Sequence, residues 1–165
     1  MEKISNTVLT EQISARFGEQ TFEFSEPIGL LTFETNKETI IEVLTYLKNE
    51  LGFNFLTDIT GIHFPEAKLP IGVIYHLHNF RQNVRIRIKV FLEDQNPSIP
   101  TAFVLWKGAD WMERETYDFF GINFEGHPDL RRILNMDDMV AFPMRKEFPL
   151  EDPNRVDKKD FFFGR

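Results

Sequence analysis

Cysteine is absent from this chain of 165 residues. Its absence excludes disulfides, a thiolate nucleophile, cysteine-ligated zinc and cysteine-ligated iron–sulfur clusters. The glycines are scattered, and neither G-x-G-x-x-G nor G-x-x-x-x-G-K-[ST] occurs. A dinucleotide, flavin or ATP bound by such a loop is therefore not expected. These absences argue against iron–sulfur clusters and loop-bound nucleotides in this chain.

Net positive charge and long apolar runs are also lacking. The formal charge is −7 and the pI is near 5.1, which argues against nucleic acid as a ligand because phosphate binding requires a basic face. The longest apolar runs, such as AFVLW, fall far short of the roughly 18 residues of a membrane-spanning helix. The first residues contain no apolar stretch typical of a signal peptide. We expect no direct membrane span, and membrane association only through a partner.

Phenylalanine is abundant instead, with 18 copies in a chain that is 42% hydrophobic. This apolar content is enough for a core and too high for a disordered chain. Because aromatic side chains carry large apolar surfaces, they either build the core or contact a partner. The length fits one domain, with room for a tail.

Helical spacing occurs in three places. Leu9, Ile13 and Phe17 predict a helix over 8–17 that stops at Gly18. A second helix is predicted after a capping box formed by Thr35 and Glu38. Its apolar stripe and its terminal glycine are Ile40, Leu44, Leu47, Leu51 and Gly52. A short helix is expected within 101–108 and a longer one over 109–120, closing at Gly121.

Strand patterns fill most of the remaining first two thirds. Strands are predicted at 21–25 and 29–34, and another at 53–64 that is broken near Gly61. Segments 71–80 and 84–92 are separated only by RQN, which predicts an antiparallel hairpin. Residues 93–100 are expected to form a loop. The fold class is therefore predicted to be α+β, a two-layer domain with a mainly antiparallel sheet packed by helices.

The chain changes character after Gly121. Four prolines, many charges and little periodicity follow, with only one short helical turn expected, starting at Pro128. We predict a compact domain over 1–121 and an extended arm over 122–165. The arm ends in FFFGR, and three exposed phenylalanines would be an aggregation risk. Either the arm folds back or a partner covers it, and we favour the partner.

The stretch 113–134 combines acids, bases and aromatics. On a helix, Arg114 and Asp118 are four residues apart and can pair, while Glu115 and Asp118 could share a site. Yet no nucleophile stands near them, and His127 lies beyond the helix end. Arg131 and Arg132 carry planar guanidinium groups suited to carboxylates on another element or chain. We interpret the stretch as an ion-pair lattice or an interface, and not as a catalytic set.

Two further patterns leave alternatives open. His76 and His78 would point to one side of a strand, where His63 or a carboxylate could complete a metal site for a hydrolase; the alternative is ordinary half-buried histidines. Arg85, Arg87 and Lys89 alternate with apolar residues along 84–92. They form either a solvated basic face or a surface that docks onto an acidic neighbour.

Taken together, ERETYDFFGINFEGHPDLRRIL (113–134) and FPMRKEFPL (142–150) resemble the signature of the 30 kDa subunit family (the C subunit) of respiratory complex I, the proton-pumping NADH:quinone oxidoreductase. YHL, the basic strand and ADW are similar too, so the resemblance covers roughly residues 30–150. Four positions differ: the family commonly has Gly, then His or Tyr, then Leu and Asp, where this chain has Ala141, Phe142, Met144 and Glu147.

The resemblance implies a protein without a bound cofactor; the iron–sulfur clusters, flavin and quinone belong to partner subunits. Its C-terminal extension would wrap onto the quinone-site (D) subunit, with the B and I subunits as neighbours. The place implied is the peripheral arm, on the cytoplasmic face of the bacterial inner membrane. A rival is the equivalent subunit of a membrane-bound hydrogenase or formate hydrogenlyase complex. The residues expected to form the partner interface or its scaffold are Glu113, Arg114, Glu115, Asp118, Gly126, His127, Pro128, Asp129, Arg131, Arg132, Arg145, Lys146, Phe161, Phe162 and Phe163.

Overall fold

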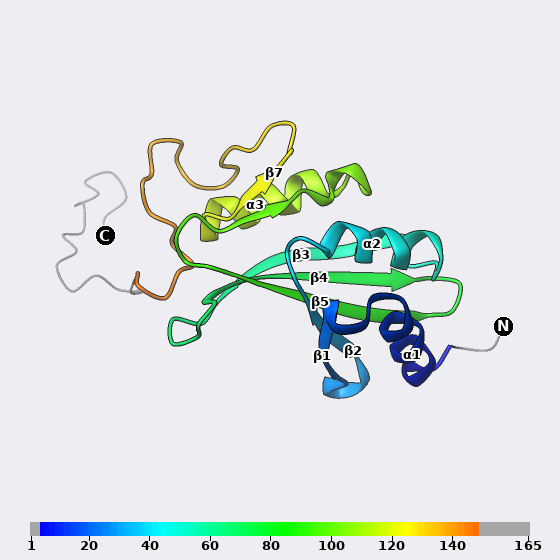
Figure 1. Ribbon diagram of the computed structural model, residues 1–165. Helices are drawn as coiled ribbons and strands as arrows, with labels where there is room; N and C mark the ends of the chain where they lie inside the picture. Colours follow the sequence, from blue (N-terminus) through cyan, green and yellow to red (C-terminus); the bar gives the residue numbers. More distant parts are fainter. Residues whose placement is uncertain (1–3, 149–165) are drawn as a thin grey trace, which may run out of the picture.

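A five-stranded sheet forms the centre of the computed structural model, which describes residues 4–148 (Figure 1). The strand order is β1-β2-β5-β4-β3, and every neighbouring pair is antiparallel except β2–β5, which is parallel. The bounds are β1 Thr21–Ser25, β2 Leu31–Thr35, β3 Phe55–His63, β4 Ile71–Asn79 and β5 Val84–Leu92. The predicted α+β class, the mainly antiparallel sheet and the hairpin of β4 and β5 are confirmed.

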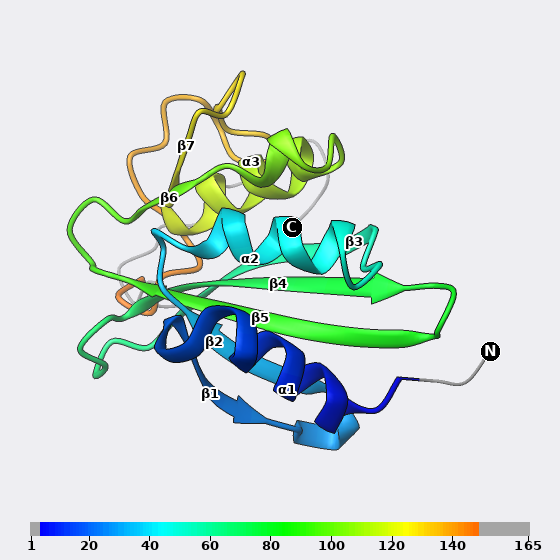
Figure 2. The ribbon, with the colours of Figure 1, turned by 45° about the vertical axis from the view of Figure 1, so that its right-hand side comes forward.

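Three helices cover one face of this sheet: α1 Asn6–Phe17, α2 Ile40–Asn49 and α3 Ala109–Phe120 (Figures 1 and 2). Alternation in β5 decides which face that is, because Val84, Ile86, Ile88 and Val90 are buried while Arg85 is exposed. Tyr75 of β4 pairs with Ile88 of β5 and is fully buried on the same face. None of the described helices covers the opposite face, which carries the basic side chains of β5.

The first two helices differ in how their N-terminal ends are capped. Ser5 caps α1 by accepting the N–H of Val8, and the predicted stripe of α1 is buried. The predicted capping box of α2 is wrong. Thr35 is the last residue of β2, and its hydroxyl donates to the carbonyl of Gln20, 2.8 Å away. Thr39 takes the cap position of α2 but bonds no N–H of the helix. Its hydroxyl instead donates to the carbonyl of Asn36 at 3.1 Å and lies 2.8 Å from the hydroxyl of Thr35.

Strand β3 runs through Gly61 without a break, so the predicted interruption there is wrong. The glycine instead provides room. A Cβ at position 61 would lie 2.4 Å from Cδ2 of Phe120, at the end of α3. The absence of a side chain at Gly61 therefore lets α3 approach β3 closely.

A second, two-stranded sheet joins the two halves of the chain. Parallel strands β6 Ser98–Pro100 and β7 Asn123–Glu125 pair beside α3, so the predicted loop at 93–100 ends in a short strand. Ile122 and Phe124 are buried, so the packed part of the chain continues just beyond Gly121. Short 3-10 turns complete the elements: η1 Gly18–Gln20, η2 Pro27–Gly29 and η3 Ala102–Val104, the last within the predicted short helix. Residues 126–148 contain no helix or strand.

Candidate functional site

Asp118 is the centre of the contacts between α3 and the segment that follows β7. Its carboxylate is fully buried, and Oδ2 accepts the backbone N–H groups of Ile133, Leu134 and Asn135 at 3.1, 2.8 and 2.9 Å. Burial alone would raise the pKa of Asp118. The N–H groups and the Arg132 guanidinium nevertheless hold the pKa well below its usual range, because they bond the charged form.

Arg132 supplies the opposite charge. Its Nη1 donates to Oδ1 of Asp118 at 2.7 Å and to the Asp118 carbonyl at 3.0 Å. Its Nη2 donates to the carbonyls of Met139 and Ala141. The guanidinium also lies 5.1 Å from the ring centroid of Phe142. One buried arginine thus ties α3 to three points along residues 132–142.

Arg114 acts on the same segment from one turn earlier in α3. It is 7% exposed and donates to the carbonyls of Arg131 and Arg132 at 3.3 and 3.2 Å. The predicted ion pair between Arg114 and Asp118 is therefore wrong, since both side chains reach across to the loop. The predicted helical turn from Pro128 is wrong too. Side chains of α3 occupy the backbone groups that a helix would bond internally.

A buried acid holds the other end of α3. Glu113 is 0% exposed and accepts the N–H of Ala102 at 2.6 Å and the hydroxyl of Thr101. Burial raises the pKa of Glu113 to about 7, although these two hydrogen bonds oppose the rise. The hydroxyl of Tyr75 is buried nearby and has no hydrogen-bond partner in the part of the chain that the structure describes. Burial, together with the charge of Glu113, raises the pKa of Tyr75.

His127 fastens the start of the loop against α3. Its buried ring places Nε2 3.4 Å from Oδ1 and 3.3 Å from the carbonyl oxygen of Asp110, and 3.9 Å from Oε2 of Glu113. Its Nδ1 accepts the N–H of Asp129 at 3.1 Å. Because one ring nitrogen accepts, the other carries the proton and faces Asp110. The loop is thus held at 127 and again at 131–135.

The last described residues close over the C-terminal end of α3. Arg145 donates to the carbonyl of Phe120 at 2.7 Å and to Asp94 at 3.1 Å. Gly121, with φ of 73°, lies against the ring of Phe142, where a Cβ would come within 2.5 Å. The N–H of Lys146 donates to Nδ1 of His63 at 2.9 Å, beside the end of β3.

The predicted site residues therefore separate into two groups. The inward group bonds α3 to the loop or, for Glu113, to Thr101 and Ala102. It contains Glu113, Arg114, Asp118, His127, Arg132 and Arg145. The outward group is exposed and contains Glu115, Gly126, Pro128, Asp129, Arg131 and Lys146. Glu115 and Asp118 share no site, since one is exposed and the other buried. Phe161, Phe162 and Phe163 lie outside the described residues.

The outward surface of the same segment is apolar at many points. The side chains that it exposes are Leu134 at 67%, Met136 at 71%, Val140 at 95%, Met144 at 54% and Phe148 at 41%. Together with the outward-group residues that follow β7 (Gly126, Pro128, Asp129, Arg131 and Lys146), they form what we call the arm surface, residues 126–148. A backbone held firmly by α3 therefore presents apolar side chains to the surroundings.

Several contributors could not be recognised in the sequence. Asp94, Thr101 and His63 bond this site from three different segments, at separations of up to 83 residues. Ala141 and Phe142 did carry a signal, because both depart from the family pattern. Ala141 has no positive φ, and its carbonyl accepts from Arg132, so the turn forms without glycine.

The three histidines of the predicted metal site bond different groups of the chain. His76 accepts from Nε of Arg87 at 2.9 Å, His78 lies 3.4 Å from the Asn83 oxygen, and His63 accepts from Lys146. Within residues 4–148, no three His, Asp or Glu side chains gather as a metal site would require. In the same range, no helix is both long and apolar enough to cross a bilayer.

Similar proteins carry one common name, the C subunit of NADH-quinone oxidoreductase. The protein of this name from Citrifermentans bemidjiense is 42% identical over 87% of this chain and 89% of its own length. The one from Geobacter metallireducens is 36% identical over 87% of this chain and 90% of its own. The one from Rhizobium leguminosarum is 46% identical over 73% of this chain and is longer, since 61% of it is matched.

Two solved structures share the fold. A trypsin-resistant fragment (1–134) of Nqo5 is 30% identical, with a TM-score of 0.67 over 75% of this chain and 98% of the fragment. A chain of an archaeal membrane-bound sulfane sulfur reductase, 22% identical, has a TM-score of 0.75 over 93% of this chain and 95% of its own length, and shows the fold alone. The model of the family described as respiratory-chain NADH dehydrogenase, 30 kDa subunit, matches residues 33–154. The chain therefore belongs to the 30 kDa subunit family of respiratory-chain NADH dehydrogenase.

Proposed function

We propose that this chain is a structural subunit, without a cofactor of its own, in the peripheral arm of a proton-pumping NADH:quinone oxidoreductase or a related complex with another electron donor. It supports electron transfer to quinone by binding the quinone-site (D) subunit, with the B and I subunits as further neighbours. The iron–sulfur clusters, flavin and quinone are bound by partner subunits. Its place is the cytoplasmic face of the bacterial inner membrane, as a peripheral protein.

One observation carries this proposal: buried side chains hold the backbone of the arm surface in place, while many of its exposed side chains are apolar. Asp118 and Arg132 hold the backbone of residues 132–141, so its shape does not depend on the apolar side chains. Val140, 95% exposed, contributes nothing to the core. Burying such a side chain against another protein would contribute about 1.5–3 kcal/mol. The backbone here is held in place by its own chain, and it exposes apolar side chains next to charged ones. Such a surface is typical of an interface between subunits.

The inward group argues for a scaffold in place of a catalytic site. Glu113 and Asp118 are both buried, and each is bonded to groups of this chain. Among residues 4–148, no nucleophile contacts His127, whose two ring nitrogens face Asp110 and Asp129. The buried charges therefore serve to position the arm surface, and the partner that it binds carries out the chemistry.

Val140→Asp tests the arm surface directly. The variant of the full chain replaces the native one in cells, and the membrane complex is isolated by native pull-down with mass spectrometry. We expect the recovery of the chain with the quinone-site subunit to fall at least about tenfold, because a buried unpaired carboxylate is costly. The purified chain should keep its unfolding midpoint, since Val140 is almost fully exposed.

Val104→Asp is the matched control. Val104 is 64% exposed on η3, so the change in residue type is the same and the position lies outside the arm surface. It should leave recovery unchanged. Equal losses in both variants would contradict a specific role for residues 126–148. Failure to recover the quinone-site subunit with the unaltered chain would overturn the proposed function itself.

The rival reading, a component of a membrane-bound hydrogenase or formate hydrogenlyase, is decided by the same isolation. Recovery with a hydrogenase large subunit in place of the quinone-site subunit would favour it. The hydrolase reading predicts stoichiometric zinc or iron in the purified chain, which elemental analysis would detect. The archaeal sulfane sulfur reductase shares the fold only and favours neither.

A further inference from the structure

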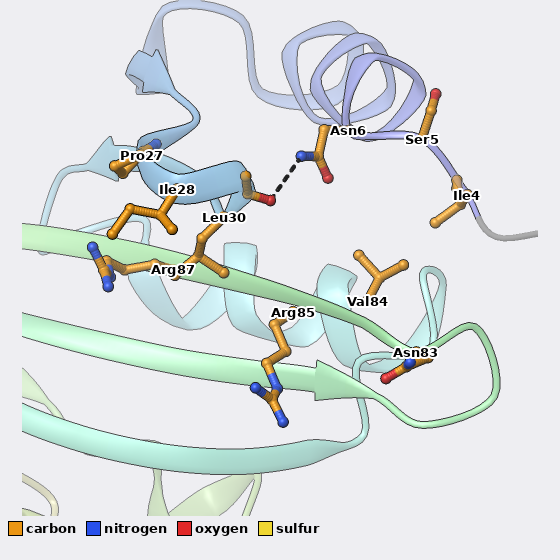
Figure 3. A pocket seen from close by; sticks show the side chains of 11 residues that line it. Ile4, Ser5, Asn6, Pro27, Ile28, Leu30, Asn83, Val84, Arg85 and Arg87 are labelled. Carbon is orange, nitrogen blue, oxygen red and sulfur yellow. Dashed lines mark hydrogen bonds between the residues drawn. The ribbon is translucent and has the colours of Figure 1, made fainter.

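A second concave surface lies away from the arm surface. It is a pocket of about 890 Å³ between the start of α1, the β1–β2 connection and the first half of β5 (Figure 3). Asn6 forms one wall, and its Nδ2 donates to the carbonyl of Gly29 at 3.3 Å, which ties α1 to η2. Figure 1 shows this end of the domain on the far side from residues 126–148.

The charge of this pocket is opposite to that of the chain. Arg85 and Arg87 of β5 line it, and no acidic residue does, although the sequence holds 26 Asp and Glu against 19 Lys and Arg. Among the described residues neither arginine forms an ion pair. The carboxylate of Glu26 contacts the lining only through Asn6, from whose Nδ2 it accepts a hydrogen bond at 3.0 Å. The two guanidinium groups therefore offer donors that no carboxylate of the described chain uses.

The side chain of Arg87 is held in place by a hydrogen bond to His76. Its Nε donates to Nε2 of His76 at 2.9 Å. Burial, and then the charge of Arg87, lowers the pKa of His76, so the imidazole stays a neutral acceptor. The bond to His76 uses the inner nitrogen of Arg87 and leaves its two terminal nitrogens for a ligand. Arg87 lines the same pocket as Pro27 and Ile28, and Figure 3 shows its side chain extending from β5.

Ile28 stands at the rim in a conformation that the isolated fold does not explain. Its φ is 57° and ψ is 34°, a left-handed backbone that β-branched residues rarely adopt. Its side chain is fully exposed and packs against nothing in the described chain. Backbone strain of this kind concentrates at binding sites, where it aims a side chain at a ligand.

We propose that this pocket binds an acidic segment of a neighbouring subunit. Arg85 and Arg87 pair with its carboxylates, and Ile28 packs on an apolar side chain between them. Charge complementarity selects an acidic partner, and the exposed Ile28 selects a polypeptide over a small anion. The inference rests on the proposed function, since it requires a multisubunit complex, and it adds a second contact remote from the arm surface.

Arg85→Glu tests the charge, with Arg81→Glu as the matched control. Arg81 is exposed in the turn of the same hairpin and does not line the pocket. In cells producing the full chain, Arg85→Glu should lower its recovery in the isolated complex about tenfold, through like-charge repulsion. Arg81→Glu should leave recovery unchanged. Equal recovery of both variants, or equal loss in both, overturns the proposal.

Ile28→Gly separates binding from folding. Glycine adopts positive φ freely, so the purified chain should gain about 2–4 °C in Tm. Recovery in the complex should nevertheless fall severalfold, because the apolar anchor is lost. A gain in Tm with unchanged recovery would show that Ile28 is only a strained loop residue, and would overturn its role.

A photo-crosslinking residue at position 28 identifies the occupant. In the assembled complex, the crosslinked peptide should come from a stoichiometric subunit and contain at least two carboxylates. A peptide without carboxylates, or no crosslink in the intact complex, overturns the proposal. So does binding of the purified chain to phosphatidylglycerol vesicles that Arg85→Glu abolishes, because the ligand would then be a lipid headgroup. Absence of the unaltered chain from the complex would instead overturn the proposed function.

Discussion

Two acids on α3, Glu113 and Asp118, are both fully buried, yet their surroundings shift the two pKa values in opposite directions. Asp118 faces three backbone N–H groups and the Arg132 guanidinium, which stabilise its charge. Glu113 faces two neutral donors, too few to offset its burial. Two side chains that look alike in the sequence therefore differ in charge state near neutral pH.

The pKa of Glu113 predicts how stability depends on pH. Because this pKa rises from 4.5 in the unfolded chain to about 7, the folded state binds more protons between those values. The free energy of unfolding should therefore fall as pH rises from 4.5 to 7, by a few kcal/mol at about 1.4 kcal/mol per pKa unit. Glu113→Gln should remove this fall, as measured by urea denaturation at pH 5 and pH 8.

Glu115→Gln is the control for that measurement, since Glu115 is exposed on the same helix. It should keep the pH profile of the unaltered chain. If Glu113→Gln is less stable than the unaltered chain at pH 8, the carboxylate is needed in its charged form and the assigned cause is wrong.

At the scale of elements, periodicity identified the helices and strands, while contacts between them set their ends. Alternation in 84–92 and the stripe of 8–17 predicted β5 and α1 because both elements bury one face. The capping box at Thr35 and the helical turn at Pro128 were wrong for one reason. In each case a neighbouring element bonds the groups that the local motif would have used. The break at Gly61 was wrong because the glycine accommodates Phe120.

Gly61→Ala tests the close approach of α3 to β3. The new methyl group would overlap the ring of Phe120 and should destabilise the fold by about 1–3 kcal/mol. Gly108→Ala is the control, because nothing lies within 4 Å of its added Cβ and its φ is −68°. Thermal unfolding of both variants measures the difference. Replacing the Phe120 ring by a smaller side chain, in the double variant Gly61→Ala/Phe120→Leu, should restore part of the stability that Gly61→Ala loses. If no stability is restored, this clash is not the cause of the loss.

At the scale of the whole molecule, one helix, α3, links the sheet to the arm surface. Its inner side packs on β3 through Phe120, and its charged side chains contact His127 and residues 131–135. The neighbouring arginines 131 and 132 show the division. Within the described chain, the Arg131 side chain is 68% exposed and pairs only with Asp129, whereas the Arg132 side chain is 8% exposed and bonds four acceptor groups.

Substitution of the two arginines should separate assembly from folding. Arg131→Ala should change the free energy of unfolding by no more than about 0.5 kcal/mol and weaken assembly with the quinone-site subunit. Arg132→Ala should cost about 3–5 kcal/mol, because it leaves the buried Asp118 carboxylate without its counter-charge. Denaturation of the purified chain and native pull-down measure the two effects. Unfolding of the Arg131→Ala chain would make Arg131 part of the scaffold.

The sequence by itself determined the fold class, the hairpin, the absence of cysteine-based cofactor sites and the family, because these depend on composition, local periodicity and a long motif. It did not determine which charges of the motif face inward. Asp118 and Arg132 lie fourteen positions apart, and Arg145 meets Asp94 across fifty-one. Only the tertiary structure brings such pairs together. Burial then decides function, because a desolvated charge must bond its own chain, whereas an exposed one remains for a partner.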